Sequence, residues 1–161
     1  MKNKVKGLVE LMQLRERLRR ERRTTVFTNG CFDILHSGHI HLFRQAKELG
    51  DILIVAVNDD PSVRSLKGPD RPVFPLEERL EVLEAVEVID YLISFSQPTP
   101  RELIQALLPD VLVKGGDWKP DEVVGKEEVE GAGGRVIIIP YLPGRSSSEI
   151  LKKVKDPPSV S

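Results

Sequence analysis

The sequence predicts one α/β domain: a doubly wound, five-stranded parallel sheet with helices on both faces. Short, continuously apolar runs alternate along the chain with longer segments whose apolar residues recur at helical spacing. Continuous apolar runs are typical of strands buried on both faces, which occur in parallel sheets covered by helices. The length of 161 residues suits a single domain with one core.

A charged amphipathic segment, residues 1–23, precedes the sheet. Within it, residues 5–18 place leucine and valine at helical spacing between basic residues, which predicts a helix. Its basic end lies where the helix dipole favours cations. Because acidic residues are interleaved and no aromatic residue accompanies them, we interpret this end as solvated rather than as a nucleic-acid-binding arm.

The body of the chain, 24–154, alternates strands with helices. The predicted strands are 25–29, 52–57, 90–95, 111–113 and 135–141. The predicted helices are 37–49, 76–88, 100–108, 121–130 and 146–154. Gly50 and Pro109 follow two of these helices and are typical stop signals. The tail, 155–161, contains proline and serine and is predicted to be disordered.

Composition excludes several classes of protein. The formal net charge is -1, which provides no long-range attraction for nucleic acid, so we expect no nucleic-acid partner. No run approaches the roughly 18 apolar residues of a membrane span, so we expect no membrane partner. Cys31 is the single cysteine and cannot form an intrachain disulfide. With the charged N-terminus, which does not resemble a signal peptide, this predicts a cytoplasmic protein.

A phosphate-binding turn is predicted directly after the first strand, in the segment GCFDILHSGH at 30–39. Gly30 permits a tight turn, so the amides of Cys31 and Phe32 can point at an anion. The helix that begins near Ser37 adds its free N–H groups and its dipole. Cys31 is expected to act through its backbone, because an activated nucleophilic cysteine needs a base partner.

The three histidines of the chain lie together in this region. His36 and His39 are separated by three positions, and Gly38 between them allows a ligand close to the backbone. Two imidazoles beside a helix N-terminus are suited to stabilising charge on a phosphoryl group in transfer. A zinc site with Asp33 as third ligand, or a purely structural role, are the alternatives. His41 is expected to face solvent.

A second cluster follows the second strand, and ligands of parallel sheets bind where the strands end. Asn58 and Asp59 come first, and Lys67 follows in a loop rich in glycine and proline. A flexible ammonium group there can reach a phosphate as a point charge. The alternative is a surface lysine without a ligand.

A third cluster ends the fourth strand in VLVKGGDW. Gly115 and Gly116 let the backbone pass close to a ligand. Asp117 offers an acceptor and Trp118 a stacking face, and Lys114 is placed to reach a phosphate or a sugar. The alternative is a glycine turn in which Trp118 only packs.

A fourth cluster, PGRSSSEIL, opens the last predicted helix. One serine among Ser146, Ser147 and Ser148 suffices to cap a helix. Three in succession after Arg145 exceed what a cap requires. Hydroxyls together with free N–H groups predict a second phosphate-binding site.

The segment GxFDxxHxGH resembles the signature of the HxGH nucleotidyltransferase superfamily, in which the histidines contact a triphosphate and stabilise the transition state at its α-phosphate. The stretch AVNDDPSVRSLKGPDRPVFPLEERLEVLEAV is similar to the adenylyltransferases of ADP-heptose synthesis. These enzymes make a lipopolysaccharide core precursor by joining ATP to D-glycero-β-D-manno-heptose 1-phosphate. The likeness covers residues 24–154 and implies a Rossmann-like fold of the nucleotidyltransferase type.

The resemblance implies a role for each motif. It makes His36, His39 and Lys67 catalytic. It assigns the nucleotide to Asn29, Gly30, Cys31, Phe32, Gly38, Gly115, Asp117, Ser146, Ser147 and Ser148. It assigns the sugar phosphate to Asp33, Asn58, Lys67, Arg79 and Trp118. On residue types alone, Arg79 is a helix arginine paired with Glu77, Glu78 or solvent.

The resemblance also implies the partners of the protein. These are ATP, with Mg²⁺ carried by the triphosphate and no metal held by the protein itself, and a sugar 1-phosphate. Members of the family are commonly homodimers. A bifunctional version carries a sugar kinase domain before this one, so here we expect a separate heptose kinase to supply the acceptor.

Two other functions fit the same residues. A cytidylyltransferase of the same superfamily, acting on glycerol 3-phosphate or a similar phosphate, differs in its nucleotide, which residue types do not decide. A non-catalytic nucleotide-binding module binds without turnover. The intact HxGH argues against such a module, because it has no need of both histidines in that form.

Overall fold

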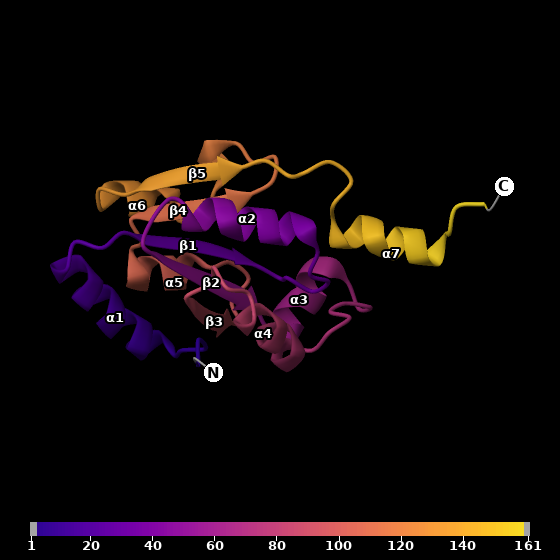
Figure 1. The fold of residues 1–161 in the computed structure, drawn as a ribbon, viewed down its shortest axis with the longest axis horizontal. Helices are drawn as coiled ribbons and strands as arrows, with labels where there is room; N and C mark the ends of the chain where they lie inside the picture. The colour runs from indigo at the N-terminus through magenta and orange to yellow at the C-terminus, as the bar shows by residue number, and fades with distance from the viewer. Residues whose placement is uncertain (1–2, 160–161) are drawn as a thin grey trace.

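The computed structural model describes residues 3–159. Its centre is a five-stranded sheet of order β3-β2-β1-β4-β5, parallel throughout (Figure 1). The strands are β1 (Thr25–Gly30), β2 (Ile52–Asn58), β3 (Tyr91–Phe95), β4 (Val111–Gly115) and β5 (Arg135–Ile139). The predicted fold class is confirmed, with each strand near its predicted position.

The order of the strands reverses beside β1. The chain passes from β1 to β2 and β3 on one side, then returns to place β4 on the other side of β1. At such a switch point the connections after β1 and β4 leave in opposite directions, which opens a crevice above the carboxyl ends of these strands. The topology therefore predicts the ligand site between them.

Helices cover both faces of the sheet. They are α1 (Leu8–Arg20), α2 (Ser37–Lys47), α3 (Asp60–Lys67), α4 (Leu76–Glu84), α5 (Arg101–Leu107), α6 (Lys126–Gly131) and α7 (Ser147–Lys155). Side chains of α1, α5 and α6 pack on one face, and those of α2 and α4 on the other. Successive residues of a strand point to opposite faces, so Val26 joins the second cluster and Phe27 the first.

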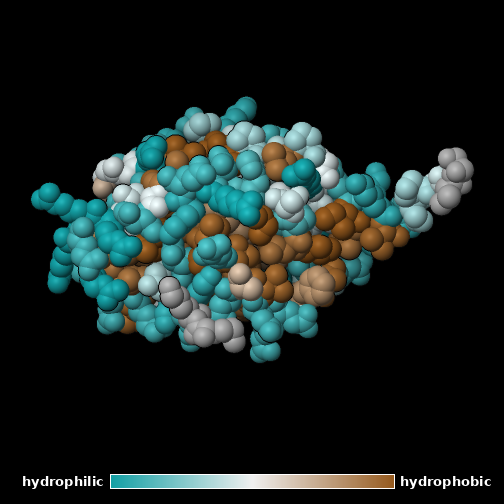
Figure 2. All heavy atoms as spheres, in the orientation of Figure 1, coloured by the Kyte–Doolittle hydropathy of each residue, from teal (hydrophilic) through white to brown (hydrophobic). Residues whose placement is uncertain are grey.

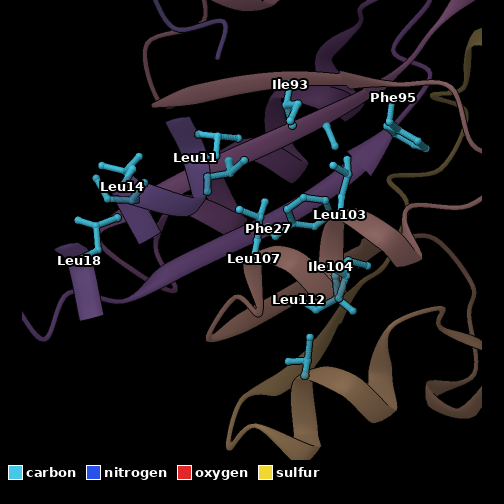
Figure 3. Close-up of a cluster of buried hydrophobic side chains, with 14 of the residues drawn as sticks. Leu11, Leu14, Leu18, Phe27, Ile93, Phe95, Leu103, Ile104, Leu107 and Leu112 are labelled. Atoms are coloured by element: carbon cyan, nitrogen blue, oxygen red, sulfur yellow. The ribbon is translucent and has the colours of Figure 1, made fainter. Parts of the chain in front are cut away.

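The leading segment is part of the core. Leu11, Leu14 and Leu18 of α1 lie on the same side of the sheet as the α5 side chains and Phe27 (Figure 3). Before α1, the chain runs beside the edge strand β3, where the backbone N–H of Lys6 donates to the Leu92 carbonyl oxygen at 2.8 Å. Helix α1, Leu8–Arg20, lies within the predicted leading segment 1–23, and residues 1–2 of that segment lie outside the described residues.

A buried arginine joins α1 to the amino-terminal edge of the sheet. Arg15 is 4% exposed, and its guanidinium donates to the carbonyl oxygens of Leu107 and Leu108 and to the Asp110 carboxylate. A buried cation is tolerated only when such partners replace its lost hydration. The basic end of the helix was predicted to be solvated. The residues from 19 to 23 are indeed exposed, whereas Arg15 is buried.

Two predictions of secondary structure are wrong. A helix, α3, occupies part of the predicted loop after β2. Asp59 caps it by accepting a hydrogen bond from the Ser62 N–H at 3.0 Å, and Pro61 in its first turn starts a helix rather than interrupting one. The predicted helix 121–130 is instead a 3₁₀ turn, Pro120–Glu122, followed by α6. Gly125 between them has a φ of 92°.

The last helix, α7, extends away from the sheet at the right of Figure 1. It has no buried residue, and Figure 2 shows apolar side chains gathered near its base while polar residues cover most of the visible face. The predicted tail begins one residue early, because Lys155 is the last residue of α7. Residues 156–159 form no helix or strand, and residues 160–161 lie outside the described part.

Candidate active site

The larger cavity, about 630 Å³, lies above the carboxyl ends of the strands. Residues at or near the end of each of the five strands line it: Asn29, Gly30, Asn58, Phe95, Lys114, Gly115 and Ile139. This placement agrees with the rule that open parallel sheets bind ligands where their strands end. The cavity is large enough for a nucleotide-sized ligand.

The cavity gathers most of the site residues predicted from the sequence. Its lining includes Asn29, Gly30, Cys31, Phe32, Asp33, His36, Gly38, His39, Asn58, Lys67, Gly115, Trp118, Ser146, Ser147 and Ser148. Two predicted residues, Asp117 and Arg79, are not part of this lining. The first cluster and the serine cluster, more than 100 positions apart in the chain, face the same space.

Both histidines are held by backbone hydrogen bonds at the start of α2. The Nδ1 atom of His36 accepts from the Gly38 N–H at 3.1 Å, and Nδ1 of His39 accepts from the His36 N–H at 3.2 Å. An acceptor nitrogen carries no proton, so in the neutral ring the proton resides on Nε2. Each imidazole therefore offers one N–H donor.

Burial keeps these imidazoles neutral. It lowers the pKa of His39 to about 4, with a further contribution from His36. Burial also lowers the pKa of His36, with a contribution from the charge of Arg145. The two ring centroids are 3.9 Å apart, so two positive charges at this distance are unfavourable. At neutral pH the pair therefore offers N–H donors to the cavity and carries no charge.

Gly38 has a packing role in addition to the predicted one, which was to let a ligand approach the backbone. A Cβ atom at this position would lie 2.8 Å from Cε1 of His36 and 3.2 Å from the Arg145 carbonyl oxygen. The missing side chain makes room for the His36 ring and for the segment that leads into α7. Gly38 therefore sets the packing of the site as well as lining the cavity.

Besides Arg71, which is paired with Asp33, three cations face the cavity from different elements. Lys67 ends α3, Lys114 lies on β4 and Arg145 precedes α7. None of them forms an ion pair with an acidic side chain within residues 3–159. Burial lowers the pKa of Lys114, while Cys31 opposes and Lys67 adds to that effect. Its Nζ lies 5.0 Å from the ring centre of Trp118, which is a cation–π contact. Unpaired cations that converge on one space suit a polyanionic ligand.

The Asp33 carboxylate is engaged by hydrogen bonds within the protein. It accepts hydrogen bonds from Arg71 Nε at 2.7 Å and from the N–H groups of Val73 and Phe74. Burial alone would raise the pKa of Asp33, but these hydrogen bonds outweigh it and the pKa lies below its ordinary value. The carboxylate therefore anchors the segment 71–74 at the rim of the cavity.

Arg79 differs from both expectations for it. It is 2% exposed, and its charge partner is Asp60, at 2.7 Å, not Glu77, Glu78 or solvent. The inward face of α4 carries it beneath the site, where its other donors bind backbone oxygens. Four of its five N–H donors are engaged by protein acceptors, and Arg79 is not part of the cavity lining.

The three serines have separate roles. Ser146 caps α7 by accepting from the Glu149 N–H at 3.1 Å, as expected for one of them. The Ser147 hydroxyl donates to the Ile34 carbonyl oxygen at 3.0 Å, which ties the start of α7 to the first cluster. Ser148 lines the cavity and forms no side-chain hydrogen bond within residues 3–159.

Several lining residues were not predicted. His41, expected to face solvent, is half-buried and lines the cavity, because α2 presents its first turn to the site. Tyr141 follows β5, and the segment 98–100 follows β3. The rule that strand ends face the site could have found the last two, since Tyr141 ends the predicted strand 135–141 and the segment 98–100 closely follows the predicted strand 90–95.

The comparisons with known proteins agree with this geometry. Residues 27–153 match the model of the family described as cytidylyltransferase-like. The chain belongs to this family, and it is therefore a nucleotidyltransferase. A strand-end cavity with an HxGH segment and unpaired cations is consistent with that chemistry.

Curated relatives are similar over nearly the whole chain. The bifunctional protein HldE of Syntrophotalea carbinolica is 47% identical over 154 residues, which cover 96% of this chain and 31% of that protein. HldE of Salmonella paratyphi A is 49% identical over 146 residues, covering 91% and 31%. The chain thus spans just under a third of the length of these relatives.

Two solved structures are similar as well. The lipopolysaccharide core biosynthesis protein from Thermoplasma volcanium has a TM-score of 0.62 at 31% identity, over 74% of this chain and 97% of that one. Pantoate-beta-alanine ligase from Francisella tularensis, complexed with beta-gamma ATP and beta-alanine, has a TM-score of 0.61 at 17% identity, over 89% and 68%. The second likeness concerns the fold alone.

Among residues 3–159, no helix has the length and apolar character needed to cross a membrane.

Proposed function

We propose that this domain transfers AMP from ATP to D-glycero-β-D-manno-heptose 1-phosphate and releases pyrophosphate. The observation that carries the proposal is the pair of neutral Nε2–H donors on His36 and His39, at a helix N-terminus, in a cavity with three unpaired cations. The likeness to HldE and to a lipopolysaccharide core biosynthesis protein supports a heptose acceptor.

The reaction is a direct in-line displacement. An oxygen of the sugar phosphate attacks the α-phosphorus of ATP, a new P–O bond forms, and the bond to the β-phosphate oxygen breaks. His36 and His39 donate hydrogen bonds to the α-phosphate oxygens, where negative charge develops. The protein contributes positioning and electrostatic stabilisation, with no covalent intermediate.

The remaining residues hold the two anions. Arg145, Ser148 and the free N–H groups at the start of α7 would bind the leaving pyrophosphate. Lys67, at the rim on the side of β2, would bind the sugar phosphate as a point charge. Trp118 offers a stacking face at the opposite rim, where it is 42% exposed. In this arrangement the pyrophosphate lies on the side of α7 and the sugar phosphate on the side of α3.

We expect Mg²⁺ to arrive with ATP and to be held mainly by the triphosphate. The polar lining of the cavity consists mainly of cations, hydroxyls and N–H groups, and the Asp33 carboxylate is already engaged. Triphosphate oxygens would therefore supply most of the ligands, as Mg²⁺ prefers. When bound, the ion would neutralise charge on the triphosphate.

Pyrophosphate release with a panel of nucleoside triphosphates and sugar phosphates tests the proposal. We expect turnover with ATP and heptose 1-phosphate and little with CTP and glycerol 3-phosphate. Preference for the second pair would assign the domain to the cytidylyltransferases. Nucleotide binding without turnover on any acceptor would favour a non-catalytic module. The acceptor also requires a heptose kinase earlier in the same route, on this or another polypeptide.

A further inference from the structure

Arg79 joins four segments of the chain beneath the cavity. One nitrogen, Nη1, donates to the carbonyl oxygens of Cys31 and Asn58, both at 2.7 Å. Nε donates to the Phe74 carbonyl oxygen at 3.0 Å, and Nη2 donates to the Asp60 carboxylate at 2.7 Å. These groups belong to the ends of β1 and β2, the segment before α4 and the start of α3. A single planar guanidinium thus fixes the relative positions of the elements that form one side of the site.

The bond to Cys31 determines where the next amide points. The peptide bond between Cys31 and Phe32 is trans and planar, so the Phe32 N–H is directed opposite to the Cys31 carbonyl oxygen. That oxygen points toward Arg79, which does not line the cavity, whereas Cys31 and Phe32 do. The Phe32 N–H therefore faces the cavity, and within residues 3–159 no protein acceptor takes it.

Phe32 has a backbone conformation that needs support. Its φ is 48°, in the left-handed region, where the backbone of a residue with a bulky side chain is strained. Its ring lies edge-on to His39, with centroids 5.4 Å apart, and packs against Phe43. A Cβ at Gly30 would lie 2.9 Å from this ring, so the turn closes tightly over Gly30. The turn thus carries both an N–H donor and the ring that supports His39.

We propose that Arg79 is a positioning residue for nucleotide transfer, because it holds the turn 30–33 in the conformation that presents the Phe32 N–H to the ligand phosphate. This role replaces the direct substrate contact that resemblance implies for Arg79. The inference rests on the proposed function, because nucleotide transfer is the reaction that the turn would assist. Asp33 supports the same arrangement, since Phe74 donates its N–H to Asp33 and offers its carbonyl oxygen to Arg79.

The test compares two buried arginines in one chain. Arg79→Lys keeps the charge but loses the planar set of donors that reaches four acceptors. Arg15→Lys makes the same change at the opposite edge of the sheet, where Arg15 also binds two carbonyl oxygens and one aspartate. Both variants should lose thermal stability. We expect kcat to fall on the order of 100-fold in Arg79→Lys, the effect of losing a preorganised donor, with KM for both substrates within threefold. Arg15→Lys should keep kcat within twofold.

A second measurement does not depend on turnover. Cys31 is the single cysteine of the chain and lies in the turn, so its alkylation by iodoacetamide reports the conformation of the turn. We expect Arg79→Lys to change the alkylation rate at least threefold at constant pH, because the charge is kept, while Arg15→Lys leaves it unchanged. If the wild-type protein showed no turnover, the proposed function would fail, and this measurement would still decide the role of Arg79.

Two results would overturn the inference. The first is an Arg79→Lys variant that keeps kcat but raises KM for the sugar phosphate more than tenfold, which indicates direct substrate contact. The second is wild-type kcat and alkylation rate in Arg79→Lys. If this variant does not fold, Asp60→Ala is the second test. It removes the charge partner of Arg79 together with the acceptor of the Leu76 N–H, and Asp60 lies outside the cavity lining. It should lower kcat several-fold with unchanged KM, and unchanged kcat would contradict the proposal.

Discussion

The Nδ1 atom of His39 accepts a hydrogen bond from the backbone N–H of His36 at 3.2 Å. This contact orients the His39 ring and closes the first turn of α2 at the same time. Because Nδ1 is occupied as an acceptor, only Nε2 is left to donate to a ligand. In the HxGH segment, the Nδ1 atom of each histidine thus accepts a backbone hydrogen bond, and its Nε2 atom stays available to a ligand.

Substitutions at His39 should separate these two uses. His39→Asn keeps an acceptor near the position of Nδ1 and loses the Nε2–H donor. We expect kcat to fall roughly 100- to 1,000-fold, as for loss of a preorganised donor. The free energy of unfolding should change by less than about 1 kcal/mol, since the capping bond is kept. Pyrophosphate release and urea unfolding measure the two quantities. Full activity in His39→Asn would remove His39 from the chemistry.

The pKa of His39 predicts how stability depends on pH. Burial lowers it to about 4 in the folded protein, against about 6.5 in the unfolded chain. Between these values the unfolded state binds a proton that the folded state does not, so stability falls as pH decreases from about 6.5 toward 4. From pH 7 to pH 5, His39 should account for about 1 to 2 kcal/mol of lost stability. His39→Asn should lose that much less over the same range, and equal losses in both proteins would contradict the assignment.

A methyl group at position 38 should disturb the site from inside. The Cβ of Gly38→Ala would press on the His36 ring and on the Arg145 carbonyl oxygen. We expect at least a tenfold loss of kcat, with a destabilisation of about 1 to 3 kcal/mol from overpacking. Gly131→Ala is the matched control, because its Cβ would meet no atom within 4 Å. If Gly38→Ala and Gly131→Ala had equal activity, the close packing around Gly38 would have no functional role.

The leading helix should contribute to global stability. Leu11 is fully buried in the core, and Leu11→Ala should lower the free energy of unfolding by about 2 to 5 kcal/mol. Met12, next along α1, is 44% exposed, so Met12→Ala should cost less than about 1 kcal/mol. Urea unfolding compares the two. A small effect of Leu11→Ala would mean that α1 is not part of the cooperative unit.

Lys67 should affect binding of the sugar phosphate. Its side chain is exposed at the end of α3, where salt screens its charge. Lys67→Gln should raise KM for the acceptor about tenfold at low salt, equal to about 1.4 kcal/mol, and by less in 0.5 M salt. Lys119→Gln removes an exposed lysine outside the cavity lining and should leave KM unchanged. An unchanged KM in Lys67→Gln would assign the acceptor phosphate to other cations.

Local patterns accounted for the elements and most of the site. Short apolar stretches marked the strands, most clearly at 52–57, because a strand buried on both faces has no polar side. Motifs directly after strands marked the cavity, since parallel strands end at the same edge. Helix α3, in which Asp59 is the cap and Pro61 lies in the first turn, was not predicted from the sequence.

The sequence by itself determined the class of the fold, the position of the phosphate-binding turn and the pair of histidines, because each depends on residues close together in the chain. Only the tertiary structure showed that the Arg79 guanidinium and the Asp33 carboxylate are engaged by other groups of the protein. Arg71 is 38 positions from Asp33, and Cys31 is 48 positions from Arg79. A buried charge takes whichever partners the fold brings to it. Residue type and spacing do not encode that choice.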